Sequence, residues 1–167
     1  VRLGAIGCGL IALVYIYRLT RDVGGGHEQA LAAVLLGCAL PGFFLSGFLM
    51  TPDAPMVAAW SAGVFYLHRA LARDQRGAWL GVGLAMGLGL LGKYPIVLLA
   101  AGAAGFVLTD PRARRWLARP QPYLAALLAL ALFCPVLAWN AAHDWASFAF
   151  QSTRRVQQSY EFSTHLL

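Results

Sequence analysis

The sequence predicts an all-α protein, a polytopic transmembrane helical bundle with about six spans. First, 59% of the residues are hydrophobic, only 12% are charged, and the mean hydropathy is +0.63; in soluble domains roughly a quarter of the residues are charged. Second, the apolar residues form continuous runs without the alternation typical of a membrane strand. Third, arginine is concentrated in alternate connections between these runs. A bilayer covers so much apolar surface directly, whereas a soluble monomer would leave it exposed to water.

Six runs approach the length of a spanning helix, which needs about 20 mostly apolar residues, with a range of about 17–25. The first run is short, and we expect it to be truncated by the start of the chain. We therefore expect residues 1–150 to form a transmembrane helical domain that is incomplete at its N-terminus, and residues 151–167 to begin an extracytoplasmic segment. The predicted spans are Leu3–Tyr17, Gln29–Met50, Ala54–Leu71, Ala78–Gly92, Pro95–Leu108 and Pro122–Trp139.

The fourth and fifth runs are separated only by Lys93 and Tyr94. They form either two short helices in a hairpin or one long helix with a buried lysine. Pro95 favours the hairpin, because a proline disfavours helical geometry at the residue before it. One long helix would also spoil the alternation of charge between connections.

Arginine and lysine predict the orientation of the bundle. Nine of the thirteen basic residues lie in three connections, which the positive-inside rule assigns to the cytoplasm. The opposite face then carries the Thr51–Asp53 turn, Lys93 with Tyr94, and the segment after Asn140. We expect a multi-pass protein of the inner (plasma) membrane. The three cytoplasmic connections are Arg18–Glu28, His68–Gly77 and Thr109–Gln121.

The net charge of +6 does not indicate a nucleic-acid partner, because in a membrane protein the position of the charges matters more than their sum. A cluster of four arginines in the third cytoplasmic connection is expected to contact anionic lipid headgroups, which makes membrane lipid a predicted partner. The cluster comprises Arg112, Arg114, Arg115 and Arg119.

Two ionisable residues on the opposite face are candidate site residues, since charge near membrane depth is costly and usually marks a site. Asp53 lies between two prolines, Pro52 and Pro55. Its carboxylate either caps the next helix or orients a cation or a substrate hydroxyl. Lys93 is the only lysine in the chain. It is either a lysine that extends from a helix end toward water or a point charge that binds a phosphate.

His143 and Asp144 lie between two tryptophans, Trp139 and Trp145. The tryptophans are typical of the interfacial aromatic belt, and His143 is then an ordinary surface residue. A histidine beside an acid also suits proton transfer or metal contact. One histidine and one carboxylate do not define a metal site, so no metal ligands are predicted. The cofactor stays open, with a divalent metal as a candidate.

Three segments, in this order, carry a resemblance: Phe44–Pro55, Gly89–Pro95 and Pro135–Phe148. Together they resemble the bacterial dolichyl-phosphate-mannose-protein mannosyltransferase-like enzymes. These are membrane glycosyltransferases of the GT-C type (glycosyltransferase family 39-like), and they include the aminoarabinose transferase of lipid A and related lipopolysaccharide sugar transferases.

The resemblance implies a hexosyl- or pentosyltransferase that acts on the extracytoplasmic face. It would move a sugar from a polyprenyl-phosphate donor to a protein, to lipid A or lipopolysaccharide, or to a cell-envelope glycan. Lys93 would bind the donor phosphate, and Tyr94 would line that pocket. Asp53 would orient cationic groups or the acceptor, and His143 and Asp144 would lie at the cavity rim in metal or acceptor contact.

The catalytic residue is unknown, because enzymes of this kind use an acid in the first external loop, often an Asp-Glu pair, and this chain has no such pair. We expect that loop upstream of Val1, so the fragment alone is expected to be inactive. Two other functions stay open. A membrane transporter or flippase also collects charge between broken helices. A structural membrane subunit would tolerate loss of Lys93 or Asp53.

Overall fold

The computed structural model describes residues 2–42 and 51–149 of the chain. All regular structure within these ranges is helical, which confirms the predicted all-α class. The residues divide into two compact units, with the boundary between Phe133 and Cys134. The helices are α1 (Arg2–Asp22), α2 (His27–Ala39), α4 (Asp53–Leu71), α5 (Ala78–Gly92), α6 (Val97–Thr109) and α7 (Pro120–Ala142), with two 3₁₀ segments, η1 (Tyr94–Ile96) and η2 (Ala113–Ala118).

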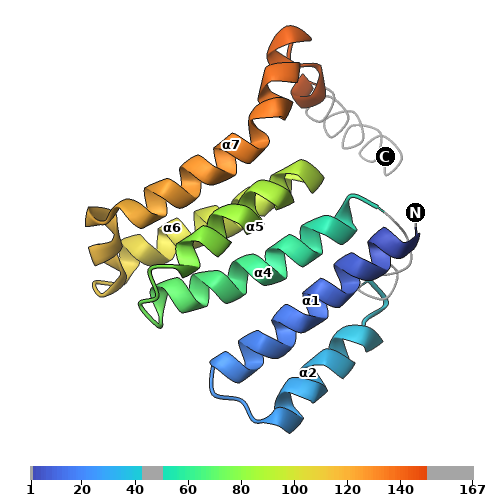
Figure 1. Ribbon diagram of the computed structural model, residues 1–167, viewed down its shortest axis with the longest axis vertical. Helices are drawn as coiled ribbons and strands as arrows, with labels where there is room; N and C mark the ends of the chain where they lie inside the picture. The colour runs from blue at the N-terminus through green and yellow to red at the C-terminus, as the bar shows by residue number, and fades with distance from the viewer. Residues whose placement is uncertain (1, 43–50, 150–167) are drawn as a thin grey trace, which may run out of the picture. The chain divides into compact units, whose positions relative to one another are not determined.

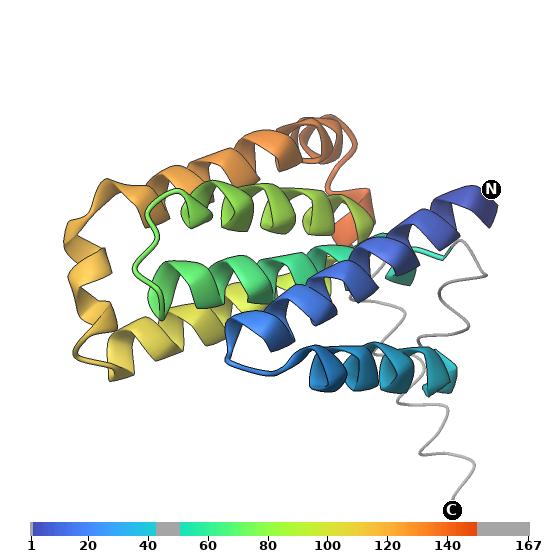
Figure 2. The same cartoon turned by 60° about the horizontal axis from the view of Figure 1, so that its bottom comes forward.

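In the first unit, α2, α1, α4 and α5 lie side by side in that order, each packed on the next (Figure 1). Helix α6 packs on both α4 and α5 (Figure 2). The α5–α7 contact depends on small residues, because a Cβ at Gly83 would lie 2.7 Å from the carbonyl oxygen of Ala125. Close packing of this kind is typical of membrane helices.

Helix α1 ends in a glycine turn. Gly24 adopts a φ of +101°, in the left-handed region that glycine enters without steric cost. Its N–H donates to the carbonyl of Arg21, and the N–H of Gly25 donates to that of Thr20. These two bonds form the Schellman motif, which satisfies the last carbonyls of a helix and directs the chain into α2.

The prediction of one continuous helix over Gln29–Met50 is wrong. Helix α2 ends at Ala39, and Leu40 is extended with a ψ of 121°. The cause is Pro41, which excludes helical geometry from the residue before it. Residues 43–50 of that predicted span lie outside the described residues.

The break between the fourth and fifth predicted spans is confirmed. Helix α5 covers the predicted range Ala78–Gly92, Lys93 is extended with a φ of −159°, and η1 leads into α6. The chain therefore turns back at Lys93 and Tyr94, and the lysine lies at a helix end.

Among the described residues, two helices, α1 and α7, are long and apolar enough to cross a membrane, judged by length and composition. Only 11% and 22% of the residues in their most apolar windows are buried within the protein. Their apolar side chains therefore face outward, unlike those of a soluble core helix. Helix α5 also has apolar side chains that face outward, on four exposed leucines, Leu80, Leu84, Leu88 and Leu91.

The other helices are shorter. The 15 residues of α5 rise only about 22 Å, against a hydrocarbon core of about 30 Å. The count of about six spans therefore stays a prediction, as do the domain limits 1–150 and 151–167.

Candidate functional site

Asp53 and Lys93 form an ion pair, although they are 40 residues apart. Asp53 is the first residue of α4, and Lys93 directly follows the last residue of α5. Because these neighbouring helices run in opposite directions, the start of one meets the end of the other. The ammonium group of Lys93 donates to Oδ1 of Asp53 at 2.5 Å. Two of the three segments that carry the family resemblance thus meet in one contact.

The structure tests one of the two interpretations of Asp53, the helix cap. Pro52 occupies the cap position of α4, and no side chain there accepts a capping hydrogen bond. The capping interpretation is therefore wrong, and the carboxylate pairs with the Lys93 ammonium instead. The role of Asp53 in orienting a cation or a substrate hydroxyl stays a prediction. A negative charge in the first turn still interacts favourably with the helix dipole.

Glycine at position 92 permits the close approach of the two segments. A Cβ there would lie 3.3 Å from Cγ of Pro55 and 3.4 Å from the carbonyl oxygen of Pro52. These distances are at or just inside ordinary contact, so a larger side chain would push α5 away from the turn. Gly92 therefore belongs to the site by its lack of a side chain.

Tyr94 begins η1 and packs on α7. Its ring meets that of Phe133 edge to face, with centroids 5.9 Å apart, a favourable aromatic geometry. The tyrosine next to Lys93 is thus held by a ring contact as well as by the helical turn.

An apolar groove begins beside the ion pair and runs between α1, α4 and α5. It holds about 600 Å³. Pro55 and Gly92 line it at the end near Asp53 and Lys93, while Tyr66 and Gly81 line it eleven residues further along each helix, a distance of about 16 Å. Its other lining residues are Cys8, Ile11, Tyr15, Ala58, Ala59, Ala62, Leu84, Ala85, Leu88 and Leu91.

A second apolar cavity, of about 550 Å³, lies among α5, α6, η2 and the first part of α7. Neither Asp53 nor Lys93 lines it. Its walls include Trp79 and Trp116, whose rings meet edge to face with centroids 5.4 Å apart. Its lining residues include no Asp, Glu, His, Lys or Arg.

In the second unit, Asn140 organises the turn after α7. Its side chain is fully buried; Nδ2 donates to the carbonyl of Val136 at 2.9 Å, and Oδ1 accepts from the N–H of Ser147 at 3.1 Å. Its own carbonyl accepts from the N–H groups of His143 and Trp145. The sequence predictions gave Asn140 no role. An asparagine at the end of an apolar run is the signal that could have indicated one.

His143 stacks on Trp139, with ring centroids 4.2 Å apart and planes inclined by 11°. Its Nδ1 lies 2.8 Å from the carbonyl oxygen of Trp139. A carbonyl only accepts, so Nδ1 carries the proton, and in a neutral ring Nε2 is left with its lone pair. Asp144 and Trp145 follow with φ angles of +51° and +57°, which are uncommon for residues other than glycine.

Metal binding by His143 and Asp144 stays a prediction. Within residues 2–42 and 51–149, no three His, Cys, Asp or Glu side chains converge in a way that could hold a metal ion. The roles of His143 and Asp144 at a cavity rim likewise stay predictions.

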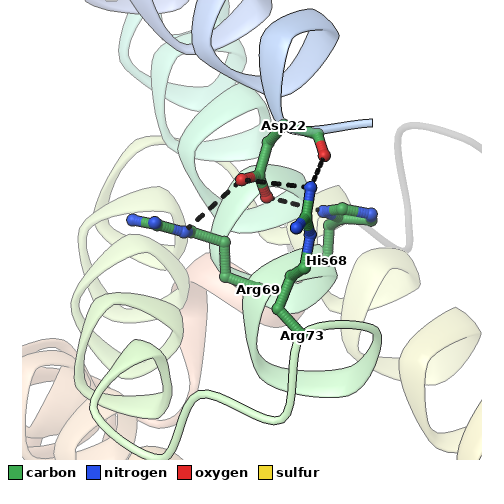
Figure 3. Close-up of polar contacts among 4 residues, drawn as sticks. All are labelled: Asp22, His68, Arg69 and Arg73. Atoms are coloured by element: carbon green, nitrogen blue, oxygen red, sulfur yellow. Dashed lines mark hydrogen bonds and ion pairs between the residues drawn. The ribbon is translucent and has the colours of Figure 1, made fainter. Parts of the chain in front are cut away.

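A polar cluster that the sequence predictions did not assign to a site lies at the other end of α4 (Figure 3). Asp22, the last residue of α1, accepts from Nδ1 of His68 at 2.9 Å. Arg69 and Arg73 approach the same carboxylate at 3.8 and 3.9 Å, and Arg73 also donates to the Asp22 carbonyl. The signal in the sequence was an acid, Asp22, that directly follows Arg21 in an arginine-containing connection.

Comparison with known proteins gives two matches. Residues 1–139 match the family described as dolichyl-phosphate-mannose-protein mannosyltransferase. Over 133 residues the chain is 29% identical to the lipid A galacturonosyltransferase RgtD of Rhizobium johnstonii, an alignment that covers 80% of this chain and 27% of that protein. The chain thus spans only about a quarter of that relative's length. No solved structure matches the chain.

Proposed function

Because this chain belongs to the dolichyl-phosphate-mannose-protein mannosyltransferase family, we propose that it is part of a membrane glycosyltransferase. The enzyme moves a sugar from a polyprenyl-phosphate donor to an acceptor on the extracytoplasmic face of the inner membrane. The acceptor is a protein, lipid A or lipopolysaccharide, or a cell-envelope glycan. The name of the relative, a lipid A galacturonosyltransferase, supports a lipid-linked acceptor.

The contact between Asp53 and Lys93 carries this proposal. An ammonium group has three N–H donors, and one of them is used by Asp53. The others are available to phosphate oxygens, because 42% of the Lys93 side chain is exposed. Asp53 holds the ammonium in place, which reduces the entropy that Lys93 loses when the donor binds.

The apolar groove supports the same function, because two of its lining residues, Pro55 and Gly92, are close neighbours in the chain of Asp53 and Lys93. A phosphate at Lys93 places the attached polyprenyl chain beside Pro55 and Gly92. From there the groove continues for about 16 Å along α4 and α5 between apolar walls. One ligand with a charged head and a long apolar tail therefore fits both features.

In the proposed reaction, a hydroxyl or amine of the acceptor attacks the anomeric carbon of the sugar. The bond between that carbon and the phosphate oxygen breaks, and its electron pair leaves with the polyprenyl phosphate. Lys93 stabilises the negative charge that develops on this leaving group. The acceptor proton passes to a general base, a role that we assign to no residue of this chain.

A transfer assay with the full-length protein tests the proposal. The protein is purified in detergent and incubated with a panel of radiolabelled polyprenyl-phosphate sugars and with lipid A as acceptor. Lys93→Ala is expected to lower the rate of transfer by about 10²–10³, the usual effect of removing one group that stabilises developing charge. Arg18→Gln is the control, because Arg18 is an exposed cation away from the ion pair.

The transporter alternative predicts a different result in the same preparation. The chain does break at Lys93 beside an ionisable group, as transporter helices often do. Proteoliposomes that move a labelled lipid-linked sugar across the bilayer, without transfer to any acceptor, would contradict the glycosyltransferase proposal. Full transfer activity of Lys93→Ala would contradict the role of the lysine.

A further inference from the structure

The three arginine-rich connections meet at one end of the first unit, opposite the Asp53–Lys93 pair (Figure 2). Asp22 joins the end of α1 to the end of α4 through His68. Asp74 joins the α4–α5 loop to η2 and the residue after it, with its carboxylate 3.2 Å from Arg115 and 3.0 Å from Arg119. The described residues at this end therefore form one connected surface.

A pocket of about 470 Å³ opens on this surface between the end of α4 and the start of α5. Two arginines line it, together with Gln75 and Tyr66. No acidic residue is among its lining residues in the described part of the chain. The lining comprises Tyr66, Arg69, Gln75, Arg76, Gly77 and Ala78.

The nearby acids do not line the pocket, although Asp22 pairs with one of its arginines, Arg69. Asp22 is shared by His68, Arg69 and Arg73 (Figure 3), so two arginines accompany one carboxylate. Asp74 has a φ of +53°, and its side chain pairs with the arginines near η2. The pocket therefore keeps an excess of positive charge.

One arginine of the pocket, Arg69, is held only loosely by its carboxylate partner. Nε of Arg69 is buried and has no hydrogen-bond partner in the described chain; its nearest carboxylate oxygen is 3.8 Å away. Figure 3 shows the guanidinium of Arg69 directed away from His68 and Arg73. The Nε nitrogen therefore faces Asp22, and the Arg69 donors available to a ligand are its other guanidinium N–H groups, because 38% of the side chain is exposed.

The start of α5 does not supply the anion-binding groups. Its first N–H groups, from Ala78, Trp79 and Leu80, donate to carbonyls of the preceding turn. The charge available to a ligand therefore comes from Arg69 and Arg76. Guanidinium groups bind phosphate oxygens with paired donors.

We propose that this pocket binds a phosphate group, held by Arg69 and Arg76 with Gln75 as a neutral partner. The group is either the headgroup of an anionic phospholipid or free inorganic phosphate. The site is separate from the Asp53–Lys93 pair, and the inference does not depend on the proposed transferase function.

Ligand binding to the full-length protein tests this site. The purified protein is titrated with inorganic phosphate in one arm and with short-chain phosphatidic acid in the other, and binding is measured by native mass spectrometry and calorimetry. Arg76→Gln is expected to weaken binding about fivefold, since one arginine near anionic lipid contributes about 1 kcal/mol. Arg69→Gln is expected to weaken it at least as much, and Arg18→Gln, an exposed arginine outside the pocket, is expected to leave it unchanged.

The two arms separate the sources of the phosphate. Binding of phosphatidic acid alone identifies a lipid headgroup, and binding of both probes identifies the phosphate itself. Arg69 also lies 5.3 Å from the Phe65 ring centroid, so thermal unfolding of each variant is measured alongside. Arg76 has no ion pair among the described residues. Arg76→Gln therefore tests the pocket without breaking an ion pair of the fold. Binding of both probes by Arg76→Gln with unchanged affinity would overturn the proposal.

Discussion

Replacing Asp53 with asparagine tests whether this carboxylate acts through Lys93. The two groups are 2.5 Å apart, yet 45% of the Asp53 side chain and 42% of the Lys93 side chain stay exposed. Exposed ion pairs contribute only about 0.2–1 kcal/mol, which corresponds to at most about a fivefold change in a rate. We expect Asp53→Asn to lower the free energy of unfolding by no more than about 1 kcal/mol and the rate of sugar transfer by up to about fivefold.

A double-mutant cycle measures this dependence. Lys93→Met removes the ammonium group but keeps an unbranched apolar side chain. If Asp53 acts by positioning the ammonium, Asp53→Asn lowers kcat/KM for transfer in the wild-type background but not in the Lys93→Met background. A radiolabelled donor keeps the slow rates measurable, and the midpoint of thermal unfolding is recorded for each variant. An equal loss in both backgrounds would refute the positioning role, because Asp53 would then act on the substrate independently.

Two further predictions concern packing and the turn after α7. Gly83→Ala places a methyl group 2.7 Å from the carbonyl oxygen of Ala125 and is expected to destabilise the protein by about 1–3 kcal/mol, seen as a lower midpoint of thermal unfolding. Gly102→Ala enters open space, and an equal loss in this control would contradict the packing argument. Asn140→Ala leaves the N–H of Ser147 without its acceptor, which costs about 1–3 kcal/mol of stability. The substitution is therefore expected to speed amide hydrogen exchange over residues 143–149. Unchanged exchange there would show that the asparagine does not hold the turn.

The helix limits were predictable where a local signal defines them. Ala78–Gly92 was predicted at both ends, because a loop with two arginines precedes it and Lys93 with Pro95 follows it. Pro41 offers the same signal as Pro95, yet the run around it was assigned to one span by its length and composition. Backbone sterics at Leu40 outweighed apolar continuity there.

For the site, the sequence predicts which residues lie on the same side of the bundle, but not which of them are in contact. Alternation of charge assigns Asp53 and Lys93 to the same side of the bundle, but no pattern in the sequence gives the distance between them. That distance depends on α4 and α5 packing as direct neighbours and on the missing side chain of Gly92. The periodicity of apolar residues along the sequence does not reveal tertiary contacts of this kind. His143 and Asp144 belong to the second unit, and their part in the site stays a prediction.

The ion pairs at the arginine-rich end bear on how such a protein is assembled in a membrane. Asp22 can meet His68, and Asp74 can meet Arg119, only when all three connections are on the same side of the bilayer. A helix inserted in the wrong direction would leave one carboxylate, or its cationic partners, stranded across the hydrocarbon layer, where an unpaired charge is expensive. In the predicted multi-pass topology, the two carboxylates therefore favour correct insertion over inverted insertion, and this preference adds to that of the positive-inside rule.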